Sequence, residues 1–226
     1  MKKIRLFLNG SFELSTFKLK INNTLLPPQS SPKNDEHIDY YAADGGLNHL
    51  LKHKIPFSSL CWVGDSDSLN KKSALFLEKN NSIKKIKRLN PKKNFSDLAA
   101  ILDLILEQNI EQNLFIEIFG GLGKRRDHET ANIEEIKRFL SLLPKGGTAL
   151  FHGGLVITTL PIKILETNCQ FFSVFANSGA VDIKGALYSG HFTLQRPSHG
   201  LSNEKINETL SITPQSGGMV SLYIEG

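Results

Sequence analysis

Short apolar runs that stop at glycine or aspartate most constrain the fold of this chain. Four of them lie in the first two-thirds of the sequence, at Ile4–Leu8, Ile38–Ala43, Leu60–Val63 and Leu114–Phe119. The last three are followed directly by Asp44-Gly45, Gly64-Asp65 and Gly120-Gly121. Strands that are buried on both faces of a parallel sheet show this pattern. We therefore predict that these runs are strands of a buried parallel sheet.

Helical segments lie between these strands and after them. Apolar residues follow helical spacing in Ser96–Gln108 and in Glu129–Leu143. Ser96 is a suitable N-cap, and Asp97 in the first turn faces the positive end of the helix dipole. Pro144 breaks the chain after the second helix. This alternation predicts an α/β nucleotide-binding domain over residues 1–146, with a mainly parallel sheet and Rossmann-like layers.

The last third of the chain has a different character. Its apolar segments are short, rich in β-forming residues and separated by turn residues: Leu155–Thr159, Phe171–Phe175, Val181–Ile183, His191–Leu194 and Val220–Ile224. No helical period is evident, so we predict a small all-β domain of the sandwich type over residues 147–226. Because so small a unit buries little apolar surface alone, we expect a partner surface to complete its core.

Composition places the chain among soluble globular proteins. Its 226 residues suffice for two domains, and no apolar stretch approaches membrane-spanning length. Cys61 and Cys169 form neither a disulfide framework nor a zinc signature, so we expect buried thiols in a reduced compartment. The N-terminal apolar run is too short for a signal peptide and contains Arg5. These features predict a cytoplasmic protein.

A basic cluster contributes much of the net charge of +5: Lys84, Lys85, Lys87, Arg88, Lys92 and Lys93. Such a cluster binds nucleic acid, attracts a polyphosphate or is only a solvated face. Because no aromatic residues alternate with it, we favour the solvated face and predict no nucleic-acid partner.

Two other segments have several interpretations. The polar stretch Asn22–His37 is long for a loop, and it is interpreted as a lid, a mobile insertion or a partly disordered segment. His49 and His53 are four residues apart on an expected helix, as in a metal-binding pair. No glutamate follows His49 in a His-Glu-x-x-His pattern, so a surface or half-buried pair is favoured.

Acidic residues gather where strands end or helices begin. Asp44, Asp65 and Asp67 follow predicted strands, Asp97 opens a helix, and Asp127 follows a glycine- and arginine-containing turn. Ligands of open α/β sheets bind beyond the carboxyl ends of the strands. Converging carboxylates repel one another unless a cation lies among them, and Mg²⁺ with a polyphosphate is a common solution. Each motif alone is equally explained by turn and capping chemistry; together they favour a site.

Taken in this order, the motifs resemble those of the thiamine pyrophosphokinase family. The matching segments are Ala43-Asp44-Gly45-Gly46, Val63-Gly64-Asp65-Ser66-Asp67-Ser68, Lys93 through Ser96-Asp97, Gly123 with Arg125, Asp127 and His128, Lys184-Gly185-Ala186-Leu187-Tyr188, and Leu201-Ser202-Asn203-Glu204. The resemblance covers nearly the whole chain apart from Asn22–His37. The ordered set is specific, although no single piece is.

The resemblance implies a thiamine diphosphokinase that uses ATP and Mg²⁺, with an α/β domain, a β-sandwich domain and a homodimer that binds thiamine near the subunit interface. Carried over by position, the catalytic residues are Asp44, Asp65, Asp67, Asp97 and Asp127, of which Asp65, Asp67 and Asp97 are metal ligands. The residues for ATP and its phosphates are Asn9, Gly45, Gly46, Lys93, Ser96, Gly123, Lys124 and Arg125. The residues for thiamine are Asp127, His128, Tyr188, Ser202 and Asn203.

Two positions depart from the family's pattern. Asn94 replaces an aspartate of the family, which removes one candidate metal ligand, and Lys124 replaces a glycine in the turn before Asp127. Two alternatives follow: a diphosphokinase for another heterocyclic alcohol such as a pterin, and a nucleotide- or thiamine-binding protein with little catalysis. The acceptor of the hydroxyl proton is either Asp127 or Asp44.

Overall fold

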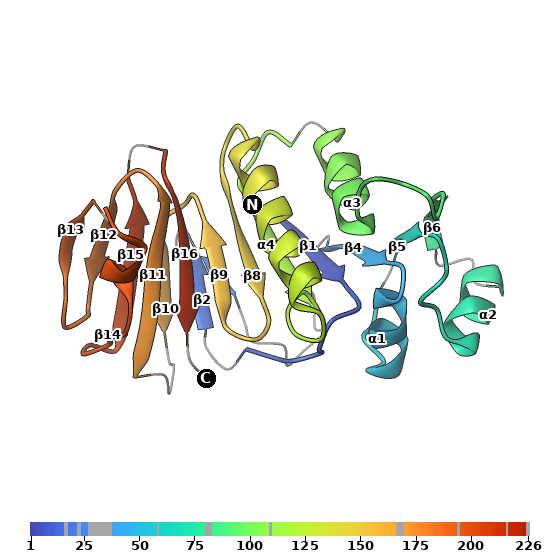
Figure 1. Ribbon diagram of the computed structural model, residues 1–226, viewed down its shortest axis with the longest axis horizontal. Helices are drawn as coiled ribbons and strands as arrows, with labels where there is room; N and C mark the ends of the chain where they lie inside the picture. The colour runs from blue at the N-terminus through green and yellow to red at the C-terminus, as the bar shows by residue number, and fades with distance from the viewer. Residues whose placement is uncertain are drawn as a thin grey trace.

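A computed structural model shows the chain as two β-sheets, with helices packed on the larger one (Figure 1). It describes residues 1–15, 18–21, 24–26, 38–57, 59–79, 83–108, 110–165, 170–193, 195–215 and 217–224. Among these residues, no helix is long and apolar enough to cross a membrane. Cys169 lies outside the described residues, and so does most of Asn22–His37 apart from a strand at Thr24–Leu26.

The larger sheet has ten strands in the order β14-β11-β16-β9-β8-β7-β1-β4-β5-β6. Its parallel half consists of β1 (Lys2–Phe7), β4 (Ile38–Ala43), β5 (Leu60–Gly64), β6 (Ile83–Arg88), β7 (Leu114–Phe119) and β8 (Gly147–Phe151). Its antiparallel half consists of β9 (Leu155–Thr158), β11 (Phe171–Ser178), β14 (Asn203–Glu204) and β16 (Met219–Ile224). The parallel pairing predicted from the apolar runs is confirmed, because β7, β1, β4 and β5 are consecutive parallel neighbours.

Helices cover both faces of the parallel half. They are α1 (Gly46–Lys52), α2 (Lys71–Lys79), α3 (Asp97–Leu106) and α4 (Arg126–Ser141). Ile101 of α3 and Phe139 of α4 share a core with Ile116 of β7. Leu47 of α1 shares another core with Phe119 of β7, and α2 contributes to the same core. Because side chains alternate along a strand, Ile116 and Phe119 place the two helix pairs on opposite faces of the sheet.

The second sheet is antiparallel, in the order β13-β12-β15-β10-β2-β3. Its strands are β2 (Lys18–Ile21), β3 (Thr24–Leu26), β10 (Ile162–Leu165), β12 (Val181–Lys184), β13 (Gly190–Phe192) and β15 (Thr209–Pro214). Ile164 and Ile212 of this sheet share a core with Val174 and Leu222 of the larger sheet. Two sheets that share a core in this way form a sandwich.

The predicted domain division at residue 146 stays a prediction. The ten-stranded sheet continues across it, because β8 pairs in parallel with β7. In addition, β2 precedes the division in sequence but pairs with β10 of the second sheet. The chain therefore passes from the parallel region to the sandwich and back before it reaches residue 146.

The two helices predicted from apolar spacing are present, but their first and last residues differ from the predicted ones. Ser96 Oγ accepts a hydrogen bond from the backbone N of Ala99 at 3.1 Å, so the predicted cap of α3 is confirmed. The helix predicted from Glu129 instead begins at Arg126, with Asp127 and Glu129 in its first turn. Carboxylates at these positions stabilise the positive end of a helix, so the earlier start is physically reasonable. Leu194, the last residue of the strand predicted over His191–Leu194, lies outside the described residues.

A partly buried ion pair lies on the face of the sheet that carries α1. Arg5 Nε on β1 donates to Glu117 Oε2 on β7 at 2.7 Å, and Arg5 Nη1 donates to Tyr40 Oη at 3.1 Å. His152 Nε2 lies 3.6 Å from the other carboxylate oxygen of Glu117. Burial alone would raise the pKa of Glu117, but the neighbouring His152 and Arg5 outweigh burial and lower that pKa.

We expect Glu117→Leu to lower the free energy of unfolding by about 3 kcal/mol or less, because Arg5 is partly buried and would stay charged with Tyr40 Oη as its remaining partner. The double variant Arg5→Met, Glu117→Leu is the matched control and should recover most of that loss. Folding lowers the pKa of Glu117, so the ionised side chain stabilises the native state. This stabilisation is fully present above the reference pKa of 4.5 and is lost as the pH falls through the lower pKa of the folded protein. Urea unfolding at neutral and at acidic pH measures both effects. Equal stability of wild type and single variant at neutral pH would contradict this account.

Candidate active site

Three carboxylates converge at the carboxyl ends of β4 and β5. Asp44 follows β4 directly, and Asp65 and Asp67 lie in the loop after β5. The two strands are parallel neighbours, so their ends meet at one edge of the sheet. One carboxylate oxygen from each of the three residues lies within 4.8 Å of the others. We call Asp44, Asp65 and Asp67 the acidic cluster.

Asp44 holds the loop that carries the other two carboxylates. Its Oδ1 accepts a hydrogen bond from the backbone N of Ser66 at 2.8 Å, and its Oδ2 accepts one from Ser68 N at 2.9 Å. The side chain is buried, and burial raises the pKa of Asp44, to which the charge of Asp67 adds. A Cβ atom on Gly64 would lie 2.7 Å from Asp44 Cβ, so only glycine allows this approach.

Lys93 connects the acidic cluster to the start of α3. Its Nζ lies 2.9 Å from Asp65 Oδ2 and 3.0 Å from Asp97 Oδ1. Burial works against the charged ammonium, but the two carboxylates outweigh it and raise the pKa of Lys93. The hydrogen bond from Lys93 lowers the pKa of Asp65, whereas burial raises that of Asp97. The structure thus groups Asp44 with Asp65 and Asp67, and Asp97 faces Lys93. The metal role predicted for Asp97 stays a prediction.

The glycines after β4 bring Asn9 next to the acidic cluster. A Cβ atom on Gly45 would lie 2.7 Å from Asn9 Cγ, and one on Gly46 would lie 2.0 Å from the backbone O of Phe7. The end of β1 therefore packs directly against the first turn of α1. This contact places Asn9, Gly45 and Gly46, three of the residues predicted for phosphates, beside Asp44.

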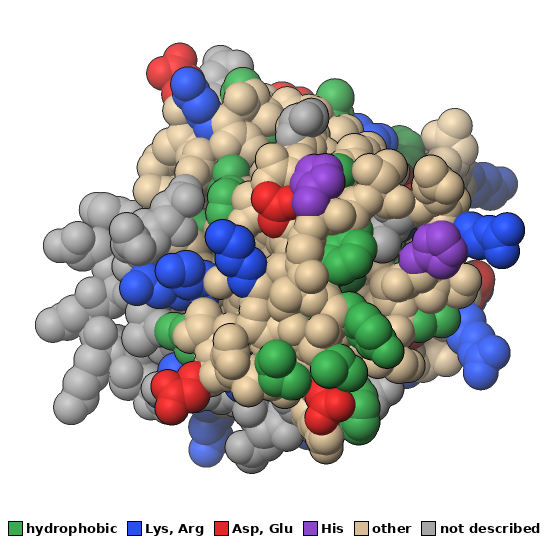
Figure 2. All heavy atoms as spheres, turned by 90° about the vertical axis from the view of Figure 1, so that its left-hand side faces the viewer, with side chains coloured by type: hydrophobic (Ala, Val, Ile, Leu, Met, Phe, Trp, Pro, Cys, Tyr) green, Lys and Arg blue, Asp and Glu red, His purple; other side chains and the backbone are tan. Residues whose placement is uncertain are grey.

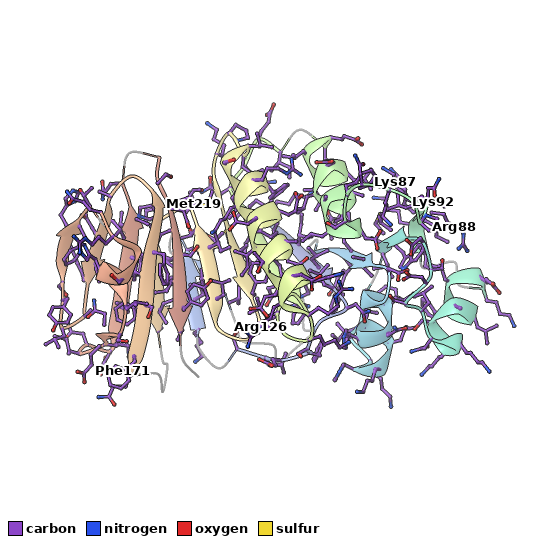
Figure 3. The ribbon with its side chains drawn as sticks, viewed as in Figure 1. Lys87, Arg88, Lys92, Arg126, Phe171 and Met219 are labelled. Atoms are coloured by element: carbon purple, nitrogen blue, oxygen red, sulfur yellow. The ribbon has the colours of Figure 1, made fainter. Side chains whose placement is uncertain are left out.

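Five predicted site residues lie in the turn before α4 and in the first turn of that helix: Gly123, Lys124 and Arg125 precede the helix, and Asp127 and His128 lie within it. Lys124 has a left-handed backbone with φ of 63°, so it keeps a conformation that favours glycine, and its Nζ donates to the backbone O of Asn9 at 2.7 Å. Arg125 and Asp127 are exposed and form an ion pair with each other, which raises the pKa of Arg125 and lowers that of Asp127. Arg126 in Figure 3 marks this start of α4.

The residues predicted for thiamine in the last third lie at the other end of the sheet. Asn203 on β14 is buried, accepts from the backbone N of Tyr188 at 3.1 Å and donates to Tyr188 O at 3.0 Å. Ser202 N donates to Ser173 Oγ at 3.1 Å. β14 is an edge strand, seven strand spacings from β4, or about 34 Å (Figure 1). One chain therefore does not bring Tyr188, Ser202 and Asn203 to the acidic cluster.

Sequence reasoning missed Arg88 as a neighbour of the acidic cluster. Arg88 pairs with Gly64 in the sheet, and its Nη1 donates to Ser66 Oγ at 2.9 Å. Its guanidinium also lies over the buried ring of Trp62, at 5.9 Å from the ring centre. Figure 3 shows Arg88 beside Lys87 and Lys92 near this end of β6. Ile83 and Ile86 are three residues apart, so the basic run does not alternate as a half-buried strand does, and its local pattern did not reveal the strand.

The two histidines considered as a metal pair belong to an aromatic stack. The His53 ring stacks on Phe12 with ring centres 3.8 Å apart, and His49 Nε2 lies 3.0 Å from the backbone O of Gly10. Burial lowers the pKa of both histidines. Because His49 Nε2 faces a carbonyl, that nitrogen carries the proton. His49 is half-buried and His53 is exposed, which agrees with the predicted surface or half-buried pair.

Residues 34–143 match the family model of the thiamin pyrophosphokinase catalytic domain, and this segment contains the whole acidic cluster. The solved thiamine pyrophosphokinase of Bacillus subtilis is 20% identical, with a TM-score of 0.69 over 100% of both chains. That of Geobacillus thermodenitrificans is 18% identical, with a TM-score of 0.68 over 99% of this chain and 98% of the other. That of Candida albicans is 15% identical, with a TM-score of 0.64 over 99% and 90%. These similarities show a shared fold. None of the curated proteins matches the chain.

Proposed function

Because the chain carries a domain of the thiamin pyrophosphokinase family over residues 34–143, we propose that it transfers the pyrophosphoryl group of ATP to the hydroxyl of thiamine and releases AMP. The observation that carries the proposal is the acidic cluster at the carboxyl ends of β4 and β5, inside the matched segment. In this reaction the thiamine hydroxyl attacks the β-phosphorus of ATP. Such transfer depends mainly on positioning and on neutralising phosphate charge.

The acidic cluster fits Mg²⁺, because its three carboxylates converge and this metal prefers oxygen ligands shared with phosphates. Asp65 and Asp67 would hold the ion, with Asp44 beside them, and the bound ion would supply positive charge opposite the phosphate oxygens. Asp44 orients the loop through Ser66 and Ser68. Lys93 limits the repulsion between Asp65 and Asp97.

Cationic side chains around the acidic cluster would bind the phosphates. Lys124 Nζ donates a hydrogen bond to the backbone O of Asn9, and Arg125 is exposed at the start of α4. Both would stabilise negative charge that spreads over the transferred group. For the hydroxyl proton, Asp44 and Asp127 are both candidates, because burial raises the pKa of Asp44 but a Mg²⁺ ion beside it would lower that pKa, and Arg125 lowers the pKa of Asp127. Asp127 is the more accessible of the two.

The separation of the predicted substrate residues supports a homodimer. Tyr188, Ser202 and Asn203 lie at the opposite end of the sheet from the acidic cluster, so a second chain would have to supply them to a shared site. Apolar side chains are exposed on the described surface at this end of the molecule (Figure 2). Leu187, Tyr188 and Leu201, which lie close to β14, have exposed side chains. A cavity of about 600 Å³ opens beside Leu201, between β11, β16 and α4. We propose that these exposed apolar side chains contact the second chain. A cytoplasmic location and the absence of a nucleic-acid partner stay predictions.

We expect AMP, and not ADP, as the nucleotide product when the protein is incubated with ATP, thiamine and Mg²⁺. The reason is that attack at the β-phosphorus expels AMP, whereas attack at the γ-phosphorus would expel ADP. Chromatography of the reaction mixture, with pterin alcohols and a mixture lacking acceptor as controls, identifies product and acceptor. ADP formation, or AMP release that does not depend on thiamine, would exclude the proposed reaction.

A further inference from the structure

The segment after β1 follows the carboxyl edge of the larger sheet on its way to the second sheet. It consists of residues 8–15, which have no regular secondary structure, and we call it the strap. In the view of Figure 1 it is the blue segment that runs along the lower edge of the larger sheet, from β1 towards β2. Gly10 N donates to the backbone O of Gly120 at 2.7 Å. Ser11 N donates to Leu122 O at 2.8 Å, so the strap lies against the turn that leads from β7 to α4.

The first residues of the strap lie beside the acidic cluster. The side chain of Asn9 packs on Gly45, the residue after Asp44. The backbone O of Asn9 accepts the hydrogen bond from Lys124 Nζ at 2.7 Å. The position of the strap therefore decides where Asn9 and Lys124 stand relative to the acidic cluster.

His152 holds the far end of the strap. This residue directly follows β8, its side chain is only 2% exposed, and its Nδ1 accepts a hydrogen bond from Ser15 N at 3.0 Å. Its Nε2 lies 3.6 Å from Glu117 Oε1, which is too long for a hydrogen bond. Within the described part of the chain, the strap therefore supplies the hydrogen bond of this ring.

The acceptor nitrogen distinguishes histidine from an apolar ring at this position. The His152 ring stacks on Phe119 with ring centres 4.1 Å apart, and Phe12 of the strap stacks on Phe119 at 5.7 Å. A phenyl ring in place of His152 would keep this stacking but would leave Ser15 N without its acceptor. A buried backbone N–H that loses its acceptor costs about as much free energy as a lost hydrogen bond. The hydrogen bond, and not the stacking, thus requires a histidine.

We propose that His152 is a positioning residue for ATP binding: it holds Ser15, fixes the strap and thereby sets Asn9 and Lys124 beside the acidic cluster. The proposal rests on the proposed function, because Asn9 and Lys124 meet phosphates only if ATP is a substrate. His152 is buried, so it acts through the strap and not by contact with ATP. If the far end of the strap is released, ATP has to order the strap when it binds, and this ordering lowers the affinity.

Three substitutions separate the acceptor nitrogen of His152 from its other contacts. His152→Phe keeps a ring against Phe119 and removes both nitrogens. His152→Gln keeps a polar end that reaches towards Glu117, in the place of Nε2. His152→Asn keeps an acceptor in the place of Nδ1, so it is the variant that retains the bond to Ser15 N. Thermal unfolding of each variant verifies that it is folded.

His152→Phe and His152→Gln should weaken Mg²⁺-ATP binding about fivefold, the effect of one lost hydrogen bond. Both should also speed amide hydrogen exchange over residues 8–15, and His152→Asn should restore most of both properties. Titration calorimetry measures the affinity, and mass spectrometry measures the exchange. In a Lys124→Gly background, His152→Phe should weaken ATP binding less, because the strap acts through Lys124. A double-mutant cycle measures this coupling.

Kinetics distinguish positioning from a general loss of structure. His152→Phe should raise the KM for ATP about fivefold and change kcat by less than about twofold, because the lost contact serves substrate and transition state alike. Wild-type exchange over residues 8–15 or wild-type ATP affinity in His152→Phe would overturn the proposal, and so would His152→Asn that is no better than His152→Gln. If the wild type binds ATP but releases no AMP with thiamine, only the proposed reaction fails, and the ATP affinities of the variants still decide the role of His152. A wild type that binds no ATP would overturn both.

Discussion

Replacing Asp67 by Asn should lower the Mg²⁺-dependent rate of AMP formation by more than about 100-fold. Removing a group that only orients a metal ligand lowers metal affinity or activity about 10- to 100-fold. The loss should be larger for Asp67, because it would be a ligand itself. The fold should be unaffected, because Asp67 is exposed and its side chain accepts a hydrogen bond from the neighbouring Ser68 Oγ at 2.8 Å. Asp65→Asn should be similarly inactive, but it also weakens the ion pair with Lys93. Initial rates over a range of Mg²⁺ concentrations measure the effect.

The control for Asp67→Asn is Glu111→Gln, which removes an exposed carboxylate in the segment between α3 and β7. It should have wild-type activity. A second readout is the effect of Mg²⁺ and ATP on the melting temperature, which should rise for the wild type and less for Asp67→Asn, since ligands that bind the native state stabilise it. If Asp65→Asn and Asp67→Asn both have the turnover rate of the wild type, these carboxylates only stabilise the turn after β5 and do not bind a catalytic metal.

Mixing two inactive variants, Asp67→Asn and Tyr188→Ala, should restore about one quarter of wild-type activity. Random pairing gives mixed dimers for about half of the molecules, and each mixed dimer has one site with both intact contributions. The prediction follows from the distance between Tyr188, beside the edge strand β14, and the acidic cluster after β4 and β5. Co-expression with two different affinity tags yields the mixed dimers for assay.

The matched control is a mixture of Asp67→Asn with Asp65→Asn. Both changes damage the acidic cluster, so each site in that mixed dimer stays defective and activity should not return. Light scattering should report a dimer for every variant. Activity of the Asp67→Asn and Tyr188→Ala mixture that merely equals the average of its components would mean that each site is built from one chain. Full activity of Tyr188→Ala alone would show that Tyr188 has no role in binding thiamine.

Parts of the site that depend on strand ends were predictable. Asp44, Asp65 and Asp67 each follow an apolar run, and parallel strands end at the same edge of their sheet, so their convergence is a consequence of the pattern. Contacts between elements that are distant in sequence were not predictable. Arg88 meets Ser66 because β6 pairs with β5, and nothing in the local sequence of either residue indicates that pairing.

The sequence by itself determined the strands β1, β4, β5 and β7, the helices α3 and α4, the cap of α3 by Ser96 and the acidic residues at strand ends, because these depend on side-chain periodicity and on contacts between near neighbours. The tertiary structure decided which groups meet. It paired β2 with β10, placed Lys93 between Asp65 and Asp97, and separated Tyr188 from the acidic cluster. The physical reason is that strand order and side-chain reach arise from burying apolar faces of the whole chain together, and no local segment contains that information.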